Sequence, residues 1–333
     1  MKKVNKLFSW SHLIAVVLVF SLLSCGQEKK QANNDIEKEV VKEEVKPFFK
    51  LSLAQWSLHK SVQDDGKSPL DFAQRAHELG FEGIEYVSQL YNDELKKDAD
   101  PQIAMENMLK ILKKKSETYG ITNVLIMVDG EGNLATLDDK ERAQTVENHK
   151  KWVDAAKYLG CHSIRVNAHG EGTYEQVAAA AVKGLTDLST YAATQGINVL
   201  VENHGGYTSN GQWLTEVMSK VNMPNCGTLP DFGNFCMTEG YGSINSDECE
   251  DPYDIYKGVA ELMPFAKAVS AKSYDFDDKG NQPKIDYAKM LQIVKDAGYT
   301  GFIGVEYEGS NLSEVEGIKA TKALLLNSSA GLK

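Results

Sequence analysis

The stretch TQGINVLVENH at residues 194–204 contains the pattern that decides the fold. A glycine, Gly196, follows an amphipathic helical segment, and a short apolar run follows the glycine and ends in the carboxylate of Glu202. Glycine is favoured just past a helix because it adopts positive φ without steric cost. A short apolar run bounded by such a signal is typical of a buried strand. The stretch therefore predicts a helix, a cap, and a buried strand with a polar end.

The same succession of helix, glycine and strand recurs along the chain. Glycines stand at the corresponding place at Gly80, Gly120, Gly160 and Gly298. Strands are expected at residues 51–55, 83–86, 123–127, 163–167, 198–202, 226–229, 268–272 and 302–306. Helices are expected at residues 69–79, 103–119, 140–159, 174–195, 211–221, 252–263, 287–296 and 313–326. Eight alternating pairs predict an α/β fold of the TIM (β/α)8 barrel type. A doubly wound open sheet is less favoured, because no glycine-rich phosphate loop follows the first strand.

The N-terminal segment has the features of a bacterial lipoprotein signal. Residues 1–6 carry three lysines and no acid, and residues 13–23 are mostly apolar. This apolar run is too short for a permanent membrane span, and Leu22-Leu23-Ser24-Cys25 resembles a lipobox. We expect residues 1–24 to be removed and Cys25 to be acylated, which predicts an exported protein anchored by lipid on the periplasmic side or at the cell surface. The alternative is an ordinary secretory signal with an incidental cysteine.

The remaining sequence predicts two further parts. Residues 25–47 are rich in Lys, Glu, Gln and Asn, which is typical of a flexible tether, and residues 48–330 form the barrel, which we interpret as the catalytic domain. The net charge of −11 argues against a nucleic-acid partner. Membrane contact is expected only through the lipid anchor. Cys236 and Cys249 could pair in an oxidising compartment, although the sequence leaves the connectivity open.

Polar side chains end most of the predicted strands. In a TIM barrel these C-terminal strand ends form one mouth, where the active site lies. The residues concerned are Gln55, Glu85, Asp129, Arg165, Asn167, His169, Glu202, His204, Asp231, Asn234, Lys272, Glu306 and Glu308. The sequence therefore predicts a polar site at the barrel mouth, with residues 232–251 as a loop that covers it.

Three of these residues are acids that end apolar runs: Glu202, Asp231 and Glu306. A buried carboxylate is costly unless it is paired, hydrogen-bonded or bound to metal. Three converging acids also repel one another, and a divalent cation commonly relieves that repulsion. The alternative is pairing with Arg165 or Lys272. Either arrangement indicates a site in which the acids lie close together.

Five phrases carry a resemblance to a known family. They are LAQWS at residues 53–57, GFEGIE at 80–85, VENH at 201–204, LPDFGN at 229–234 and VEYEG at 305–309. In their order and spacing, residues 50–327 resemble the xylose isomerase-like barrel superfamily of sugar isomerases and epimerases. The resemblance implies a small sugar or sugar derivative as substrate. Barrels of this type often dimerise, so a homodimer is expected by analogy.

The resemblance implies a divalent metal ion, such as Mg²⁺ or Mn²⁺, held by Glu202, Asp231 and Glu306. Relatives place a fourth ligand, a histidine, on strand seven, where this chain has Ser270. A hydroxyl is a poor substitute for imidazole on a transition metal. We therefore expect weaker binding, or a preference for hard ions such as Mg²⁺. A nitrogen ligand from His204 or His169 is a less favoured alternative.

The implied reaction removes a proton from a carbon next to a carbonyl and passes through an enediolate. Glu202 and Glu306 are the expected acid/base pair. Lys272 is expected either to neutralise developing negative charge or to serve as a salt-bridge partner. The residues expected to hold substrate hydroxyls are Gln55, Glu85, Arg165, Asn167, His204 and Asn234.

Two other functions remain open at the level of sequence. The same enolisation could start a lyase or hydratase reaction on a keto-sugar or keto-glycoside. A barrel that had lost its metal could be a carbohydrate-binding lipoprotein, which Ser270 favours and the retention of all three acids disfavours. Phosphodiester chemistry is weakly supported, because the chain lacks the histidine-rich cluster that a multi-metal site needs.

Overall fold

The computed structural model describes residues 46–238 and 240–332. The expected signal peptide, Cys25 and nearly all of the expected tether lie outside these residues. Within the described ranges, no helix combines the length and apolar character that a membrane span requires.

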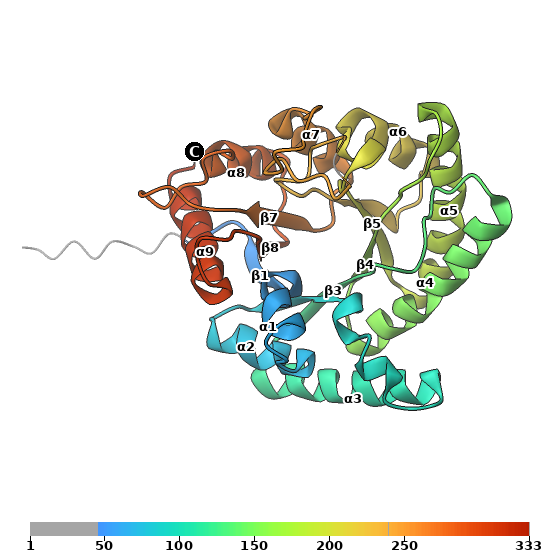
Figure 1. Ribbon diagram of the computed structural model, residues 1–333. Helices are drawn as coiled ribbons and strands as arrows, with labels where there is room; N and C mark the ends of the chain where they lie inside the picture. The colour runs from blue at the N-terminus through green and yellow to red at the C-terminus, as the bar shows by residue number, and fades with distance from the viewer. Residues whose placement is uncertain (1–45, 239, 333) are drawn as a thin grey trace, which may run out of the picture. The chain divides into compact units, whose positions relative to one another are not determined.

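Eight parallel strands alternate with helices around a closed ring (Figure 1). The strands are β1 (Lys50–Ala54), β2 (Gly83–Val87), β3 (Thr122–Met127), β4 (Ser163–Val166), β5 (Asn198–Glu202), β6 (Cys226–Leu229), β7 (Val269–Ser273) and β8 (Phe302–Tyr307). The helices are α1 (His59–Gln63), α2 (Phe72–Glu78), α3 (Pro101–Tyr119), α4 (Asp139–Leu159), α5 (Tyr174–Gln195), α6 (Gly211–Val221), α7 (Ile255–Leu262), α8 (Tyr287–Asp296) and α9 (Glu314–Ala330). The predicted TIM barrel is confirmed, and the short helix α1 is an addition to the expected elements.

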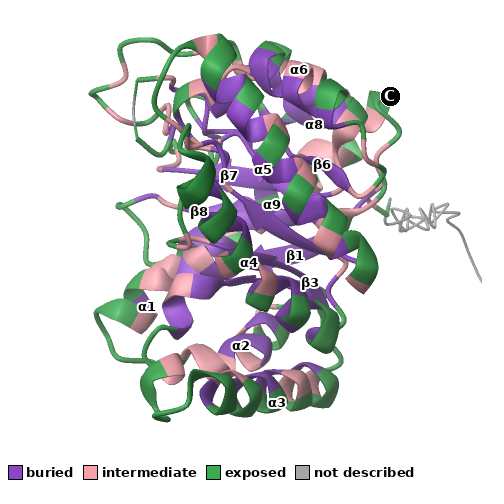
Figure 2. Cartoon of the chain, turned by 90° about the vertical axis from the view of Figure 1, so that its right-hand side faces the viewer, coloured by how far each residue is buried: buried purple, intermediate pink, exposed green. Residues whose placement is uncertain are grey.

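The predicted glycine caps are present at the ends of the long helices. Gly120, Gly160 and Gly196 end α3, α4 and α5 with φ of 65°, 82° and 73°. Each cap lets the chain reverse into the following strand, so the strands all run in the same direction. The outward faces of the helices are exposed while the strands are buried (Figure 2). Hydrophobic burial on both sides of the sheet therefore holds the ring together.

The barrel closes between β6 and β7 by a few backbone hydrogen bonds. The strand order runs β6-β5-β4-β3-β2-β1-β8-β7, and isolated bridges join the two ends at Thr228 with Ala266 and at Asp231 with Ser270. The Phe232 N–H donates to the Ser270 carbonyl at 3.1 Å, and the Ser270 N–H donates to the Pro230 carbonyl at 2.9 Å. This closure places Asp231 beside Ser270 at the mouth.

The loop after β6 is fixed at two points. A disulfide joins Cys236 to Cys249, so the pairing that the sequence left open is present. Within the loop that this disulfide closes, a Cβ on Gly242 would lie 2.5 Å from the backbone nitrogen of Gly205, so the loop packs directly on the segment after β5. Tyr241, next to Gly242, lies at the barrel mouth.

Glu85 lies inside the barrel on β2 and is fully buried. Its Oε1 accepts a hydrogen bond of 2.6 Å from the Ser52 hydroxyl, while Oε2 has no hydrogen-bond partner. A Cβ on Gly304 would lie 2.6 Å from this carboxyl group, so the glycine makes room for it. Loss of water around the carboxylate raises the pKa of Glu85 to about 8, against the opposing effect of Ser52. The folded protein therefore holds a proton on Glu85 at neutral pH.

This proton links stability to pH. Between pH 5 and pH 8 the folded state keeps the Glu85 proton and the unfolded state loses it, so this group lowers the free energy of unfolding by about 1.4 kcal/mol per pH unit. Glu85→Gln removes the contribution, and its free energy of unfolding should fall less steeply from pH 5.5 to pH 7.5. Denaturant unfolding of both proteins at the two pH values measures the difference. Equal slopes would show that Glu85 is ionised in the folded state.

Candidate metal and substrate site

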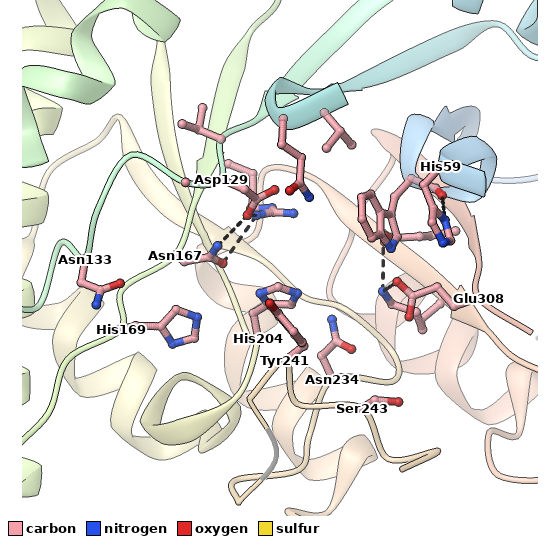
Figure 3. A pocket seen from close by; sticks show the side chains of 18 of the residues that line it. His59, Asp129, Asn133, Asn167, His169, His204, Asn234, Tyr241, Ser243 and Glu308 are labelled. Carbon is pink, nitrogen blue, oxygen red and sulfur yellow. Dashed lines mark hydrogen bonds and ion pairs between the residues drawn. The ribbon is translucent and has the colours of Figure 1, made fainter. Parts of the chain in front are cut away.

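A cavity of about 790 Å³ lies at the C-terminal ends of the strands (Figure 3). Its walls come from loops and strand ends around the barrel. The side chains that line it include Trp56, His59, Asp129, Arg165, Asn167, His169, His204, Asn234, Tyr241, Lys272, Glu306 and Glu308. Its volume is within the range of small-molecule sites. The polar strand ends that the sequence indicated therefore surround a space large enough for a substrate.

Three carboxylates converge beside this cavity. Glu202 ends β5, Asp231 follows β6, and Glu306 is near the end of β8; one oxygen from each lies within 4.8 Å of the others. Their exposed fractions are 2%, 0% and 3%. Glu306 borders the cavity, whereas Glu202 and Asp231 are not among its wall residues. The fold thus brings together acids that are far apart in the sequence.

Each acid accepts a hydrogen bond from a nearby polar group. The Asn234 side-chain amide donates to Glu202 Oε1 at 3.1 Å. The Gly233 N–H donates to Asp231 Oδ1 at 2.8 Å. The Ser270 hydroxyl donates to Glu306 Oε2 at 2.9 Å. These contacts orient the carboxylates, and they place Ser270 inside the acidic cluster.

Two oxygens of the cluster are left without a hydrogen bond: Glu202 Oε2 and Asp231 Oδ2. Glu202 Oε2 lies 2.7 Å from Nε of Arg165, as an ion pair without hydrogen-bond geometry. Buried polar atoms are normally satisfied, so Asp231 Oδ2, which has neither a hydrogen bond nor an ion pair among the described residues, indicates a missing partner. Carboxylates and a hydroxyl are the ligands of hard cations. The residues present therefore fit a divalent metal ion, with Glu202, Asp231 and Glu306 as ligands.

Burial raises the proton affinity of two of these acids. Loss of water is the largest effect on both. It raises the pKa of Glu202 to about 8, with Arg165 opposing the shift, and the pKa of Asp231 to about 7, with Lys272 opposing it. A carboxyl group whose pKa lies near neutrality can both hold and release a proton in that range. The site therefore contains groups able to exchange a proton near neutral pH.

Lys272 supplies positive charge to the other side of the cluster. Its Nζ lies 3.3 Å from Glu306 Oε1 and 3.1 Å from Glu308 Oε1, and the side chain is 2% exposed. Burial by itself would lower the pKa of Lys272, but Glu306, Glu308 and two other acids raise it well above its ordinary value. The ammonium group is therefore charged while it contacts Glu306.

Arg165 links Glu202 to a second network. Its Nη1 donates to Asp129 Oδ1 at 2.7 Å, and the Asn167 amide donates to the same oxygen at 2.8 Å (Figure 3). Burial alone would lower the pKa of Arg165, but Asp129 and Glu202 outweigh it and raise the pKa. Arg165 is therefore a permanent cation held between two carboxylates. The sequence left open whether the acids pair with Arg165 or Lys272. Such ion pairs are present at Glu202 and at Glu306.

Two histidines face the same part of the cavity (Figure 3). The rings of His169 and His204 are 6.2 Å apart, and that of Tyr241 is 5.6 Å from His204. Burial, followed by Arg165, lowers the pKa of both histidines, so they are neutral at pH 7. Nδ1 of His204 is buried without a hydrogen-bond partner. A neutral ring at this position can exchange hydrogen bonds with a substrate hydroxyl.

The residues expected to hold substrate fall into two groups. Arg165, Asn167, His204 and Asn234 border the cavity. Gln55 and Glu85 are inside the barrel and are not among its wall residues. The Gln55 side chain accepts from the Val87 N–H and donates to the Tyr91 hydroxyl, which fixes the loop after β1.

Asp129 and Glu308, which the sequence placed among the polar strand ends without a specific role, border the cavity. The structure adds His59 and Tyr241 to its wall. The ring of Trp56 stacks on His59 at 4.3 Å beside the cavity. Tyr241 is in an irregular loop with no periodicity, so nothing in the sequence distinguished it.

A family model described as a xylose isomerase-like TIM barrel matches residues 73–327 of this chain. Among curated proteins, the 3'-dehydrocarminate deglycosidase alpha subunit of a Microbacterium species is 40% identical over 48 residues. That match covers 14% of this chain and 14% of the relative. The local similarity therefore spans only a small part of either protein.

Solved structures share the fold at low sequence identity. The 3-keto-D-glucoside 4-epimerase of E. coli, in its apo form, has a TM-score of 0.63 and 13% identity, covering 84% of this chain and 99% of that chain. A xylose isomerase-like TIM barrel protein from Mycobacterium smegmatis, in complex with magnesium, has a TM-score of 0.59 and 16% identity, covering 86% and 98%. The family model covers most of the folded residues. The chain belongs to the xylose isomerase-like TIM barrel family.

Proposed function

We propose that this protein is an exported, metal-dependent sugar isomerase or epimerase that works by proton transfer next to a carbonyl. The observation that carries the proposal is the cluster of Glu202, Asp231 and Glu306, with two buried oxygens that lack hydrogen-bond partners beside a cavity. The magnesium complex of the Mycobacterium structure and the keto-glucoside epimerase fold of the E. coli structure support it.

The carboxylates of the cluster would transfer the protons of this reaction. Glu202 and Glu306 are near each other at the mouth, so one carboxylate can take the proton from the carbon next to the carbonyl while the other returns a proton to the product. The electron pair of the broken C–H bond enters the enediolate. A divalent cation, when bound by Glu202, Asp231 and Glu306, would polarise the substrate oxygens and stabilise that negative charge. Lys272, charged and in contact with Glu306, adds a fixed positive charge.

A keto-glycoside lyase is the second candidate. The observation that favours it is the local similarity to a deglycosidase subunit. Such a reaction begins with the same proton abstraction, so it needs the same carboxylates. It differs in the fate of the enediolate, which expels a group from the neighbouring carbon instead of regaining a proton.

Glu202→Gln and Glu306→Gln should each reduce turnover by about 10²–10⁴-fold, because an amide cannot accept the proton. The measurement is the exchange of substrate C–H for solvent deuterium, followed by NMR with a 3-keto-glucoside. Far-UV circular dichroism controls for folding. Exchange at the wild-type rate in both variants would exclude these residues as the acid/base pair.

Metal binding has its own test. Asp231→Asn should lose the divalent ion that the wild-type protein retains after dialysis, because one of the three carboxylates is gone. Asp154→Asn, an exposed position on α4, is the matched control and should keep it. Elemental analysis measures the ion content of Asp231→Asn and of Asp154→Asn. In a separate variant, Ser270→His should tighten zinc binding by adding an imidazole to the cluster. An ion content in Asp231→Asn equal to wild type would place the ion elsewhere.

The proposed anchor depends on Cys25. Cys25→Ala removes the thiol that would carry the lipid, and the variant should move from the membrane fraction to the soluble fraction of the expressing bacterium. Immunoblotting of fractionated cells measures this. A variant that stays in the membrane fraction would contradict the lipoprotein assignment.

A further inference from the structure

A second cavity, of about 510 Å³, adjoins the first on the side of β4 and β5. It lies between the start of α5, the segment after β5, and the disulfide-bonded loop after β6. His169 borders both cavities, so the two spaces are neighbours across a single side chain. The proposed acid/base chemistry uses only the first cavity.

The wall of the second cavity is aromatic and rigid. Tyr174 and Tyr207 contribute two rings that meet edge to face at 5.8 Å, and Met237 adds a thioether. The ring of Tyr207 stacks on Trp213 at 5.8 Å, and its hydroxyl donates to the Gly172 carbonyl at 3.1 Å. Trp213 is itself fully buried and donates to the Tyr174 carbonyl at 3.2 Å. The wall is therefore held in place before any ligand arrives, which lowers the entropic cost of binding.

The chemistry of this wall indicates its ligand. Aromatic faces and a thioether contact the apolar face of a flat or puckered ring. The carboxylate of Asp251 also borders this cavity, and it would repel a phosphate or a carboxylate. A sugar ring reacting at Glu306 occupies the first cavity, so a ring attached to that sugar and extending past His169 would enter the second.

We infer that the second cavity is a subsite for the ring substituent of a glycoside, so that the substrate is a keto-glycoside larger than a free monosaccharide. This inference rests on the proposed function for the position of the reacting sugar. The subsite itself is made by Tyr174, Tyr207 and Met237, which are separate from the acidic cluster.

The test compares two probes that differ only in the substituent: methyl β-D-glucoside and phenyl β-D-glucoside. Neither has a carbonyl, so neither can be turned over. Phenyl β-D-glucoside should bind about fivefold more tightly to the wild-type protein, as expected for one added aromatic contact. Isothermal titration calorimetry gives both dissociation constants. Equal affinities would overturn the inference.

Variants in the wall of the second cavity show where the preference for the phenyl probe arises. Tyr207→Ala should reduce the preference for the phenyl probe to less than twofold while leaving the affinity for the methyl probe unchanged. Tyr207→Phe keeps the ring and should keep the preference, as should Tyr158→Ala, an exposed tyrosine on α4. If Tyr207→Ala does not fold, Met237→Trp, which fills the cavity, should have the same effect. An equal loss of affinity for both probes would overturn the inference.

The two proposals can fail separately. A protein that exchanges no deuterium into a 3-keto-glucoside, yet prefers the phenyl probe through Tyr207, keeps the subsite and loses the proposed function. A protein that exchanges deuterium with the same kcat/KM for methyl and phenyl 3-keto-glucosides keeps the function and loses the subsite.

Discussion

The structure depends on the burial of three carboxylates at one end of a closed barrel. Glu202, Asp231 and Glu306 repel one another, and each has lost nearly all contact with water. Arg165 and Lys272 offset part of that repulsion from opposite sides, at 2.7 Å and 3.3 Å. Each cation also contacts a second carboxylate, Asp129 in the case of Arg165 and Glu308 in the case of Lys272, so the charges at the mouth form one connected network. The site and the stability of the mouth are therefore coupled.

Barrel closure is what sets the geometry of this cluster. β6 and β7 meet through isolated bridges, and one of these pairs Asp231 with Ser270. The position on strand seven where the resemblance implied a histidine is thus inside the cluster, where the Ser270 hydroxyl contacts Glu306. An oxygen at this position makes the set of candidate ligands entirely oxygen, which suits hard cations better than zinc.

The loops after β4, β5 and β6 form a second cavity next to the one at the barrel mouth. The disulfide between Cys236 and Cys249 and the close contact of Gly242 with Gly205 fix the loop that carries Tyr241 and Met237. Loops of TIM barrels determine the substrate while the strands supply the reacting groups. In this chain the strand ends supply the acids, and the loops supply an aromatic wall.

The sequence by itself determined the barrel, because helix caps such as Gly196 and apolar runs such as that before Glu202 are local signals. It also indicated the acidic cluster, since strand ends in a barrel share one mouth. Only the tertiary structure decided that Glu85 lies inside the barrel, where Gly304 makes room for it. It also decided that Arg165 joins Glu202 to Asp129, and that Tyr207 stacks on Trp213. These features depend on side-chain contacts between separate βα units, which leave no periodic pattern in the chain.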